Sequence, residues 1–500
     1  MDTSDNMNAS GLSRRLVMGA AAFGAALPFA RAEAAEPAAP KITPDQLLAQ
    51  LRAVLDDKGV LTGDGITGRY LPRRAKEKPL AVLRPTTTAE VSAIMKICNA
   101  AKQPIVPQGG NSGLVNATIA KTSEIILSLE RMDQIEEVNA DNRTMTVGAG
   151  VVLMNAQTHA AENGFLLPLD MGSRGEATLG GMVATNAGGY QVVRYGMTRE
   201  SVLGLEVVLV DGTVVSSMNR MIKNNAGFDL KHIFIGCEGL LGVVTRVVLR
   251  LRAEQDNKLT ALVAVDHSDG VPLLLRTLER KLGGTMTCFE IMWANYDEFV
   301  RKYSPHLLSP LKAGYPYYVI VEATGSDAGS ERARFTKVIN EVRKDKIIAD
   351  ASIAKDEDAR NAIWAMREQA GAAFVELGPF WGYDISLPVG DMAPYGLRVK
   401  AEVEAAFPGA HMLIMGHVGD GNLHIVAAPG SRDPAVKKKV DDIVYGAVRD
   451  MKGSVSAEHG IGLEKHDYLS WSRSPEEIAL MNTLKKTLDP QNLLNPGKLL

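Results

Sequence analysis

Three glycine-rich segments between residues 104 and 250 constrain the fold of this chain more than any other feature. They alternate with short β-branched runs, such as 124–127, 145–147 and 205–210. Because glycine lets the backbone approach a ligand closely, successive N–H groups can surround a phosphate. We therefore expect a strand-rich domain in which several backbone segments contact one long ligand. A turn-rich β domain without a ligand is the alternative.

The first segment, Pro107–Leu114, reads PQGGNSGL and follows a short strand candidate. It is not a Walker loop, because no Gly-Lys-Ser/Thr follows, and it is not the GxGxxG dinucleotide fingerprint. The second segment extends over 170–189 and the third over 234–245. Glycine content alone does not identify the ligand of these loops.

The bulk composition excludes several classes of protein. The 500 residues suffice for two or three domains, and a net charge of −3 argues against a nucleic-acid partner. Cys98, Cys237 and Cys288 are far apart and odd in number, which argues against a disulfide framework or a cysteine metal site.

The N-terminus has the pattern of a leader. Arg14 and Arg15 precede an apolar run of about 15 residues, which is too short for a comfortable membrane span. Two A-x-A sites follow at 30–34, so we expect a Tat-type signal peptide over 1–34 and a periplasmic enzyme exported in its folded state. A plain secretory signal or an uncleaved anchor is the alternative. We expect no transmembrane span in the mature chain.

The second half of the chain has a different sequence pattern, in which strand candidates alternate with helix candidates. This pattern predicts an α+β domain with an antiparallel sheet. Helix starts are predicted at Thr43, at Thr87 with Glu90, and at Ser474. The strand candidates are 259–266, 286–292, 317–323, 347–353 and 383–389, and the helix candidates are 270–282, 330–344, 357–374, 392–406 and 434–452.

Two histidines flank a candidate hairpin turn in the sequence GHVGDGNLH. If residues 419–422 form the loop, His417 faces His424 across the hairpin, and the two imidazoles could hold one divalent metal. A hydrogen-bonded histidine pair is the alternative. Glu458 and His459 stand together in a glycine-flanked loop and offer a third ligand and a proton acceptor.

The stretch from Gly109 to Thr245 resembles the FAD-binding domain shared by vanillyl-alcohol oxidase and p-cresol methylhydroxylase, and within that group the D-lactate and D-2-hydroxyglutarate dehydrogenases. The resemblance covers nearly all of residues 45–500. It implies an α+β architecture: a two-part FAD-binding domain over 35–255, and an α+β substrate (cap) domain with an antiparallel sheet over 256–500, whose last residues could return to the FAD domain. It also implies FAD, held noncovalently, because the first loop has Asn111 and Ser112 where covalent relatives have a histidine or cysteine tether.

By this resemblance the first loop holds the pyrophosphate, the second lines the flavin and ribityl chain, and the third lies near the adenine or flavin edge. The implied cofactor-binding residues are Pro107, Gly109, Gly110, Asn111, Ser112, Gly113, Leu114, Asp170, Gly172, Ser173, Thr178, Gly181, Thr185, Asn186, Glu238, Gly239, Gly242 and Val244.

The same resemblance implies catalytic roles in the second half. His417, His424 and Glu458 would bind a divalent metal, usually zinc, and His459 would be the base. Arg367 would bind the substrate carboxylate, although an arginine on a helix is more often a surface charge. Hydroxyglutarate-specific relatives have a lysine where this chain has Gly382.

The resemblance therefore predicts an FAD-dependent dehydrogenase that oxidises a D-2-hydroxy acid, with D-lactate favoured, by hydride transfer to flavin N5. D-2-hydroxyglutarate dehydrogenase and an oxidase using oxygen are alternatives. A zinc hydrolase would lack a yellow chromophore, and an inert flavin binder would not be bleached by hydroxy acids. The electron acceptor is expected to be a partner such as cytochrome c or a quinone, and a homodimer is left open.

Overall fold

The computed structural model describes residues 42–72, 74–255 and 257–500, and the leader predicted over 1–34 lies outside them. The first helices are α1 (Pro44–Val54) and α2 (Thr88–Ala101), each begun by the predicted cap. Thr43 and Thr87 both form complete capping boxes. The first sheet has the order β1-β2-β4-β3, with β2 and β3 parallel to β4. Its strands are β1 (Val60–Leu61), β2 (Ala81–Leu83), β3 (Ile105–Gln108) and β4 (Ile125–Ser128).

A five-stranded antiparallel sheet follows, with the order β5-β6-β10-β8-β9. Its inner face packs against α3 and α4 around a core of buried aliphatic residues. The first glycine segment leaves the end of β3, the second runs into α4, and the third lies between α7 and β10. The elements are β5 (Ile135–Asn139), β6 (Thr144–Gly148), α3 (Leu153–Glu162), β7 (Phe165–Leu166), α4 (Leu179–Thr185), α5 (Val192–Tyr195), α6 (Thr198–Ser201), β8 (Val202–Val208), β9 (Val214–Ser217), α7 (Lys231–Phe234), β10 (Val243–Arg250) and β11 (Arg252–Ala253).

The second half is built on a seven-stranded antiparallel sheet with the order β15-β12-β14-β13-β17-β18-β16. The antiparallel sheet confirms the predicted α+β class. Its strands are β12 (Asn257–Val265), β13 (Met286–Trp293), β14 (Tyr317–Gly325), β15 (Asp350–Ile353), β16 (Trp381–Ser386), β17 (His411–Gly416) and β18 (Asn422–Ala428).

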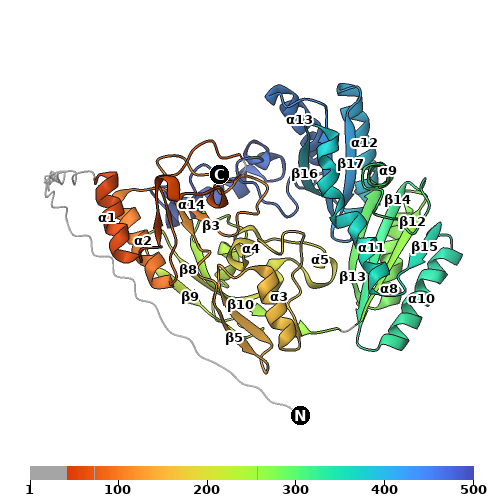
Figure 1. Ribbon diagram of the computed structural model, residues 1–500, viewed down its shortest axis with the longest axis horizontal. Helices are drawn as coiled ribbons and strands as arrows, with labels where there is room; N and C mark the ends of the chain where they lie inside the picture. Colours follow the sequence, from red (N-terminus) through yellow and green to blue (C-terminus); the bar gives the residue numbers. More distant parts are fainter. Residues whose placement is uncertain (1–41, 73, 256) are drawn as a thin grey trace, which may run out of the picture. The chain divides into compact units, whose positions relative to one another are not determined.

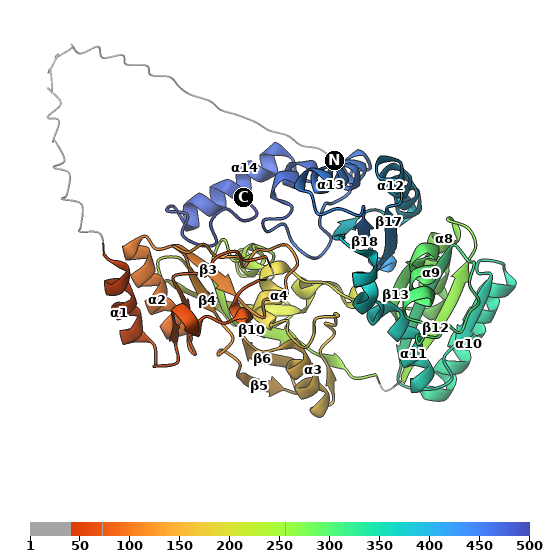
Figure 2. The same cartoon turned by 45° about the horizontal axis from the view of Figure 1, so that its top comes forward.

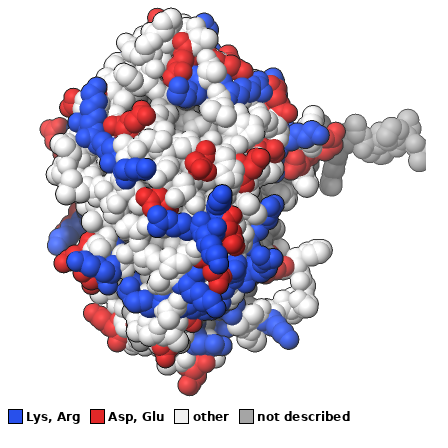
Figure 3. All heavy atoms as spheres, turned by 90° about the vertical axis from the view of Figure 1, so that its right-hand side faces the viewer, with Lys and Arg blue, Asp and Glu red and all other residues white. Residues whose placement is uncertain are grey.

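Helices cover both faces of this sheet (Figures 1 and 2). One face packs against α8 (Gly270–Leu282), α10 (Ala328–Lys344), α12 (Met392–Ala406) and α13 (Pro434–Asp450). The other face packs against α9 (Ala294–Tyr303), α11 (Glu357–Glu368) and the 3-10 helix η3 (Ala370–Leu377). On the surface shown in Figure 3, basic and acidic side chains are interspersed.

The last forty residues contact the glycine-rich half of the chain. Leu494 forms a parallel bridge with Ile105, and Lys485 Nζ donates to the carbonyl of Leu240 at 3.0 Å. These contacts hold α14 (Pro475–Leu488) and the residues after it beside the first and third glycine segments, whereas η6 (His466–Trp471) packs against α13. Among the described residues, no helix combines the length and the apolar character that crossing a bilayer requires.

A candidate catalytic cluster beside the glycine loops

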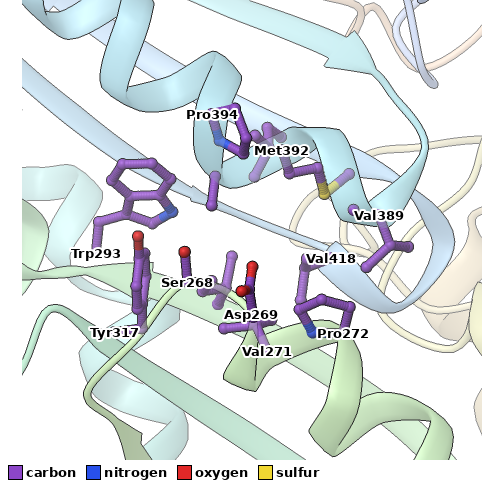
Figure 4. Close-up of a pocket in the computed structure, with 14 residues that line it drawn as sticks. Ser268, Asp269, Val271, Pro272, Trp293, Tyr317, Val389, Met392, Pro394 and Val418 are labelled. Carbon is purple, nitrogen blue, oxygen red and sulfur yellow. The ribbon is translucent and has the colours of Figure 1, made fainter.

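A cavity of about 840 Å³ brings together the glycine loops and the seven-stranded sheet. A second cavity of about 520 Å³ lies on the far side of the first loop, and Asn111 and Glu176 line both. The two cavities together match the expectation of one long ligand. A third cavity, between Trp293, Met392 and Val418 (Figure 4), has about 20 Å³, room for roughly one water.

Close contact between the first and second glycine loops explains why glycine is needed there. A Cβ on Gly109 would lie 2.4 Å from Thr178 Oγ1, and one on Gly110 would lie 1.8 Å from the carbonyl oxygen of Glu176. Thr178 Oγ1 is buried and has no hydrogen-bond partner within the described part of the chain. A buried hydroxyl without a partner at a cavity wall is a group that a bound ligand can satisfy, so these loops fit a phosphate-containing cofactor.

The hairpin that carries the two histidines has a different register from the predicted one. Met415 on β17 pairs with His424 on β18, and His417 lies beyond the strand, so the predicted pairing of His417 with His424 was wrong. Gly416 has φ 151°, and a Cβ there would lie 2.6 Å from the Asn422 carbonyl oxygen, so the chain leaves the ladder at this glycine. The imidazoles nevertheless meet, with ring centroids 5.1 Å apart at 87°.

Three histidine Nε2 atoms surround one oxygen, Glu458 Oε1. The distances are 3.7 Å for His417, 3.5 Å for His424 and 3.6 Å for His459. Ligands at about 2.1 Å from a tetrahedral metal lie about 3.4 Å from one another, so this spacing fits a metal site. Asp384, His424, Glu458 and His459 also each offer a ligand atom within 4.8 Å of the others. This group has Asp384 and His459 in place of the predicted ligand His417, so His459 is itself a candidate ligand.

Two of the three candidate ligands, Glu458 and His424, have the charge state that a metal requires. Burial alone would raise the pKa of Glu458, but its hydrogen bond to His417 and the charges of His417 and His424 lower it to about 2. Burial and the charge of His417 lower the pKa of His424 to about 3. An ionised carboxylate beside a neutral imidazole is the protonation state that a divalent cation requires of its ligands. Against the effect of burial, Glu290 and Glu458 raise the pKa of His417 well above its usual value, so a metal bound by His417 would have to displace its proton.

Glu290 is a member of this site that the sequence analysis missed. It lies on β13 with no exposed surface; its Oε1 bonds His417 Nδ1, and its Oε2 accepts a hydrogen bond from Arg367 Nε at 3.2 Å. One carboxylate thus orients both a histidine of the cluster and the candidate substrate-binding arginine. A signal was present, because a glutamate in the apolar run 286–293 has no structural reason to be buried unless it is paired.

Asp384 is the second missed residue. It pairs with His424 across β16 and β18, and its Oδ2 accepts hydrogen bonds from the backbone N–H of Glu458 at 3.2 Å and of His459 at 3.1 Å. Lys465 Nζ donates to the same oxygen at 3.2 Å. These bonds hold the Glu458-His459 loop against the sheet.

Arg367 lies in the cavity and is not a surface charge. Its side chain, in the last turn of α11, is 11% exposed, and Nη1 and Nη2 have no hydrogen-bond partner among the residues that the structure describes. Trp364 Nε1, one turn earlier, donates to buried Glu322 at 3.0 Å and anchors the helix to the sheet. The free edge of the guanidinium is available to a carboxylate.

Several predicted cofactor residues also make contacts within the protein, and their roles toward a cofactor stay predictions. The Glu238 carboxylate accepts the N–H groups of Ile461 at 2.7 Å and Gly462 at 2.8 Å, which joins the third loop to the Glu458-His459 segment. Asn186 Oδ1 accepts from the Arg199 N–H, and Asp170 Oδ1 accepts from Arg174 Nε. Three others pack: Gly242 against Val207, Gly239 against Pro107, and Val244 in the core. Cavity-lining positions are Asn111, Ser112, Gly113, Leu114 and Gly172 beside the cluster, and Gly109, Gly110 and Thr178 beyond the loop.

Each half of the chain matches the model of a known protein family. Residues 79–217 match an FAD binding domain, and residues 254–499 match the C-terminal domain of FAD linked oxidases. Solved structures with the same fold include p-cresol methylhydroxylase, at TM-score 0.74 and 18% identity over 91% of this chain and 96% of that one. Alkyldihydroxyacetonephosphate synthase matches at TM-score 0.70 and 17% identity over 92% of this chain and 85% of that one.

Curated relatives are similar along most of their length. A mitochondrial D-2-hydroxyglutarate dehydrogenase of Rattus norvegicus is 36% identical over 84% of this chain and 78% of its own. A mitochondrial protein of Schizosaccharomyces pombe with a D-lactate dehydrogenase name is 35% identical over 84% and 82%. A D-2-hydroxyglutarate–pyruvate transhydrogenase of Saccharomyces cerevisiae is 33% identical over 92% and 95%.

These relatives overturn the expected localisation. Those from rat and fission yeast are mitochondrial, so the prediction of a periplasmic enzyme exported by the Tat pathway was wrong. The prediction depended on Arg14 and Arg15, which lie outside the described residues. An arginine pair before an apolar run is a short pattern that several kinds of leader share, and it carries little information by itself.

Proposed function

This chain belongs to the family of FAD-linked oxidoreductases that includes the D-2-hydroxyglutarate and D-lactate dehydrogenases, and we propose that it oxidises a D-2-hydroxy acid to the 2-oxo acid. The observation that carries the proposal is the cavity itself. It combines a buried guanidinium with a free edge, a cluster of three histidines around Glu458, and glycine loops that fit a phosphate-containing cofactor.

We propose that FAD is held noncovalently along the two cavities, by the loop of Gly109 and Gly110 and by Thr178. The bound flavin supplies the acceptor for the hydrogen that leaves the substrate as hydride. In support of noncovalent binding, the first loop has Asn111 and Ser112 and no histidine or cysteine. The matches at 79–217 and 254–499 support a division of the chain near residue 255.

The chain's own groups bind and deprotonate the substrate in this proposal. Arg367 binds the carboxylate with Nη1 and Nη2, while its Nε remains fixed by Glu290. His459 takes the proton of the hydroxyl group, and Asp384 holds its backbone in place. The residues that would hold a divalent metal, zinc being our choice, are His417, His424 and Glu458. Such an ion would lower the pKa of the substrate hydroxyl.

A monocarboxylate is the favoured substrate class, with D-lactate as its smallest member. Gly382 lines the cavity where hydroxyglutarate-specific relatives have a lysine. Three further cations line the cavity, and each forms an ion pair within the protein. Arg74 pairs with Glu464, Lys437 with Asp441, and Lys465 with Asp384. The alternative, D-2-hydroxyglutarate, is favoured by the name of the rat relative.

The test is dye-linked turnover by the FAD-loaded enzyme, with metal analysis of the same preparation. We expect turnover with D-2-hydroxy acids, stoichiometric metal, and a lower kcat/KM for D-2-hydroxyglutarate than for monocarboxylates. A lost charge-assisted contact costs about 1.5–3 kcal/mol, roughly ten- to hundredfold in specificity. Turnover of no hydroxy acid would refute the proposal.

A further inference from the structure

We propose that the substrate carries a bulky apolar side chain, aromatic or branched aliphatic, in place of the methyl group of lactate; this inference rests on the function proposed above. Apolar side chains line part of the cavity next to the histidine cluster and Arg367, and this part has more free space than a methyl group can fill.

One apolar surface begins directly at His424. Because side chains alternate along a strand, Val426 lies on the same face of β18 as His424, about 6.6 Å further along. Gly382 pairs with Val426 on the neighbouring strand β16, and Met415 pairs with His424 on β17. All three line the cavity. Beyond His424, the positions that these three residues occupy on the sheet face are therefore apolar, although Asp384, which pairs with His424, lies on the same face.

A second apolar surface lies in the segment after Glu368, a cavity-lining residue that pairs with Arg174. The 3-10 helix η3 follows α11, and its Gly371 and Phe374 line the cavity. Phe374 meets Phe380 edge to face, with ring centroids 6.0 Å apart at 80°. Phe380 remains 40% exposed and lines the cavity together with Trp381. Exposed aromatic edges at a concave site are typical of pockets that bind apolar groups.

The two glycines at this end of the cavity leave room for a large group. A Cβ added to Gly371 or to Gly382 would meet no atom within 4 Å. The methyl group of lactate would leave the half-buried Phe374 in contact with water. A benzyl or isobutyl group could reach Phe374, and that contact would remove apolar surface from water. A second carboxylate at this end would be desolvated against aromatic rings, and the cavity-lining cations Lys437 and Lys465 are already paired with Asp441 and Asp384.

The experiment compares kcat/KM of the FAD-loaded enzyme for D-lactate, D-2-hydroxy-4-methylpentanoate, D-3-phenyllactate and D-2-hydroxyglutarate. One methylene in an apolar pocket is worth about 10- to 200-fold in discrimination. We expect D-3-phenyllactate and D-2-hydroxy-4-methylpentanoate to exceed D-lactate at least tenfold. Phe374→Ala should lower kcat/KM for phenyllactate by a larger factor than for lactate.

Val375→Ala is the matched control, because Val375 lies in the same 3-10 helix, is 72% exposed and does not line the cavity. It should leave the substrate order unchanged. If D-lactate or D-2-hydroxyglutarate exceeds both apolar acids, the inference is wrong while the proposed function stands. If Phe374→Ala lowers kcat/KM by the same factor for all four substrates, the apolar side chains around Phe374 do not determine the substrate preference. If no acid is turned over, the proposed function itself fails.

Discussion

Replacing Glu290 tests whether one buried carboxylate organises both halves of the proposed site. Glu290→Ala would leave the buried guanidinium of Arg367 without its partner, a loss that costs about 3–5 kcal/mol of folding free energy. Glu290→Gln is the gentler change, because the amide oxygen still accepts from one of the two donors, Arg367 Nε or His417 Nδ1. The amide NH2 then faces the other donor, and we expect a loss of about 1–3 kcal/mol.

The informative readout for Glu290→Gln is metal affinity, measured by competition with a chelator. Groups that orient a metal-binding histidine are worth about 10- to 100-fold in affinity, so we expect a decrease of that size. Denaturant unfolding of the same protein gives the stability loss separately. KM for the hydroxy acid should also rise, because Arg367 loses its fixed orientation.

Glu322→Gln is the control for general destabilisation. Glu322 lies on the neighbouring strand β14, is 3% exposed, and accepts hydrogen bonds from Arg360 Nε and Trp364 Nε1. Its loss should lower stability by a similar amount and leave metal affinity unchanged. The assigned role of Glu290 would be refuted if Glu290→Gln bound metal as tightly as the wild type. It would also be refuted if Glu322→Gln lost as much metal affinity as Glu290→Gln.

One acid treatment and four substitutions separate the parts of the site. Acid precipitation should release all the yellow FAD into the supernatant, and flavin retained on the chain would contradict noncovalent binding. His417→Ala and His424→Ala should lose bound metal and keep FAD. His459→Ala should keep both metal and FAD, and it should slow flavin reduction about 10²–10⁴-fold. If His459→Ala loses the metal, His459 is a ligand and not the base. Glu238→Gln should lower the free energy of unfolding by about 1–3 kcal/mol, because its carboxylate accepts two backbone N–H groups, and unchanged stability would argue against that role.

Local signals predicted much of the fold. The helices at 270–282 and 392–406 lie at the predicted residues, and the capping boxes at Thr43, Thr87 and Ser474 all form. These features depend on residues a few positions apart, whose interactions a sequence pattern records directly.

The parts that the sequence did not predict depend on contacts between distant residues. Glu290 and His417 are 127 positions apart, and no local pattern links them. The predicted hairpin register assumed that the first strand continues to His417. The strand β17 ends at Gly416, whose positive φ a sequence pattern does not reveal. The resemblance implied Glu238 as a cofactor residue, which stays a prediction, and it gave no sign that the Glu238 carboxylate joins two segments of the protein.

The most direct test of the central claim is anaerobic stopped-flow mixing of the FAD-loaded enzyme with the D and L enantiomers of one apolar 2-hydroxy acid. Our account predicts bleaching of the flavin band by the D enantiomer, saturating with concentration, and none on the same time scale by the L enantiomer. Equal bleaching by both, or an unchanged flavin band with every 2-hydroxy acid tried, would contradict it.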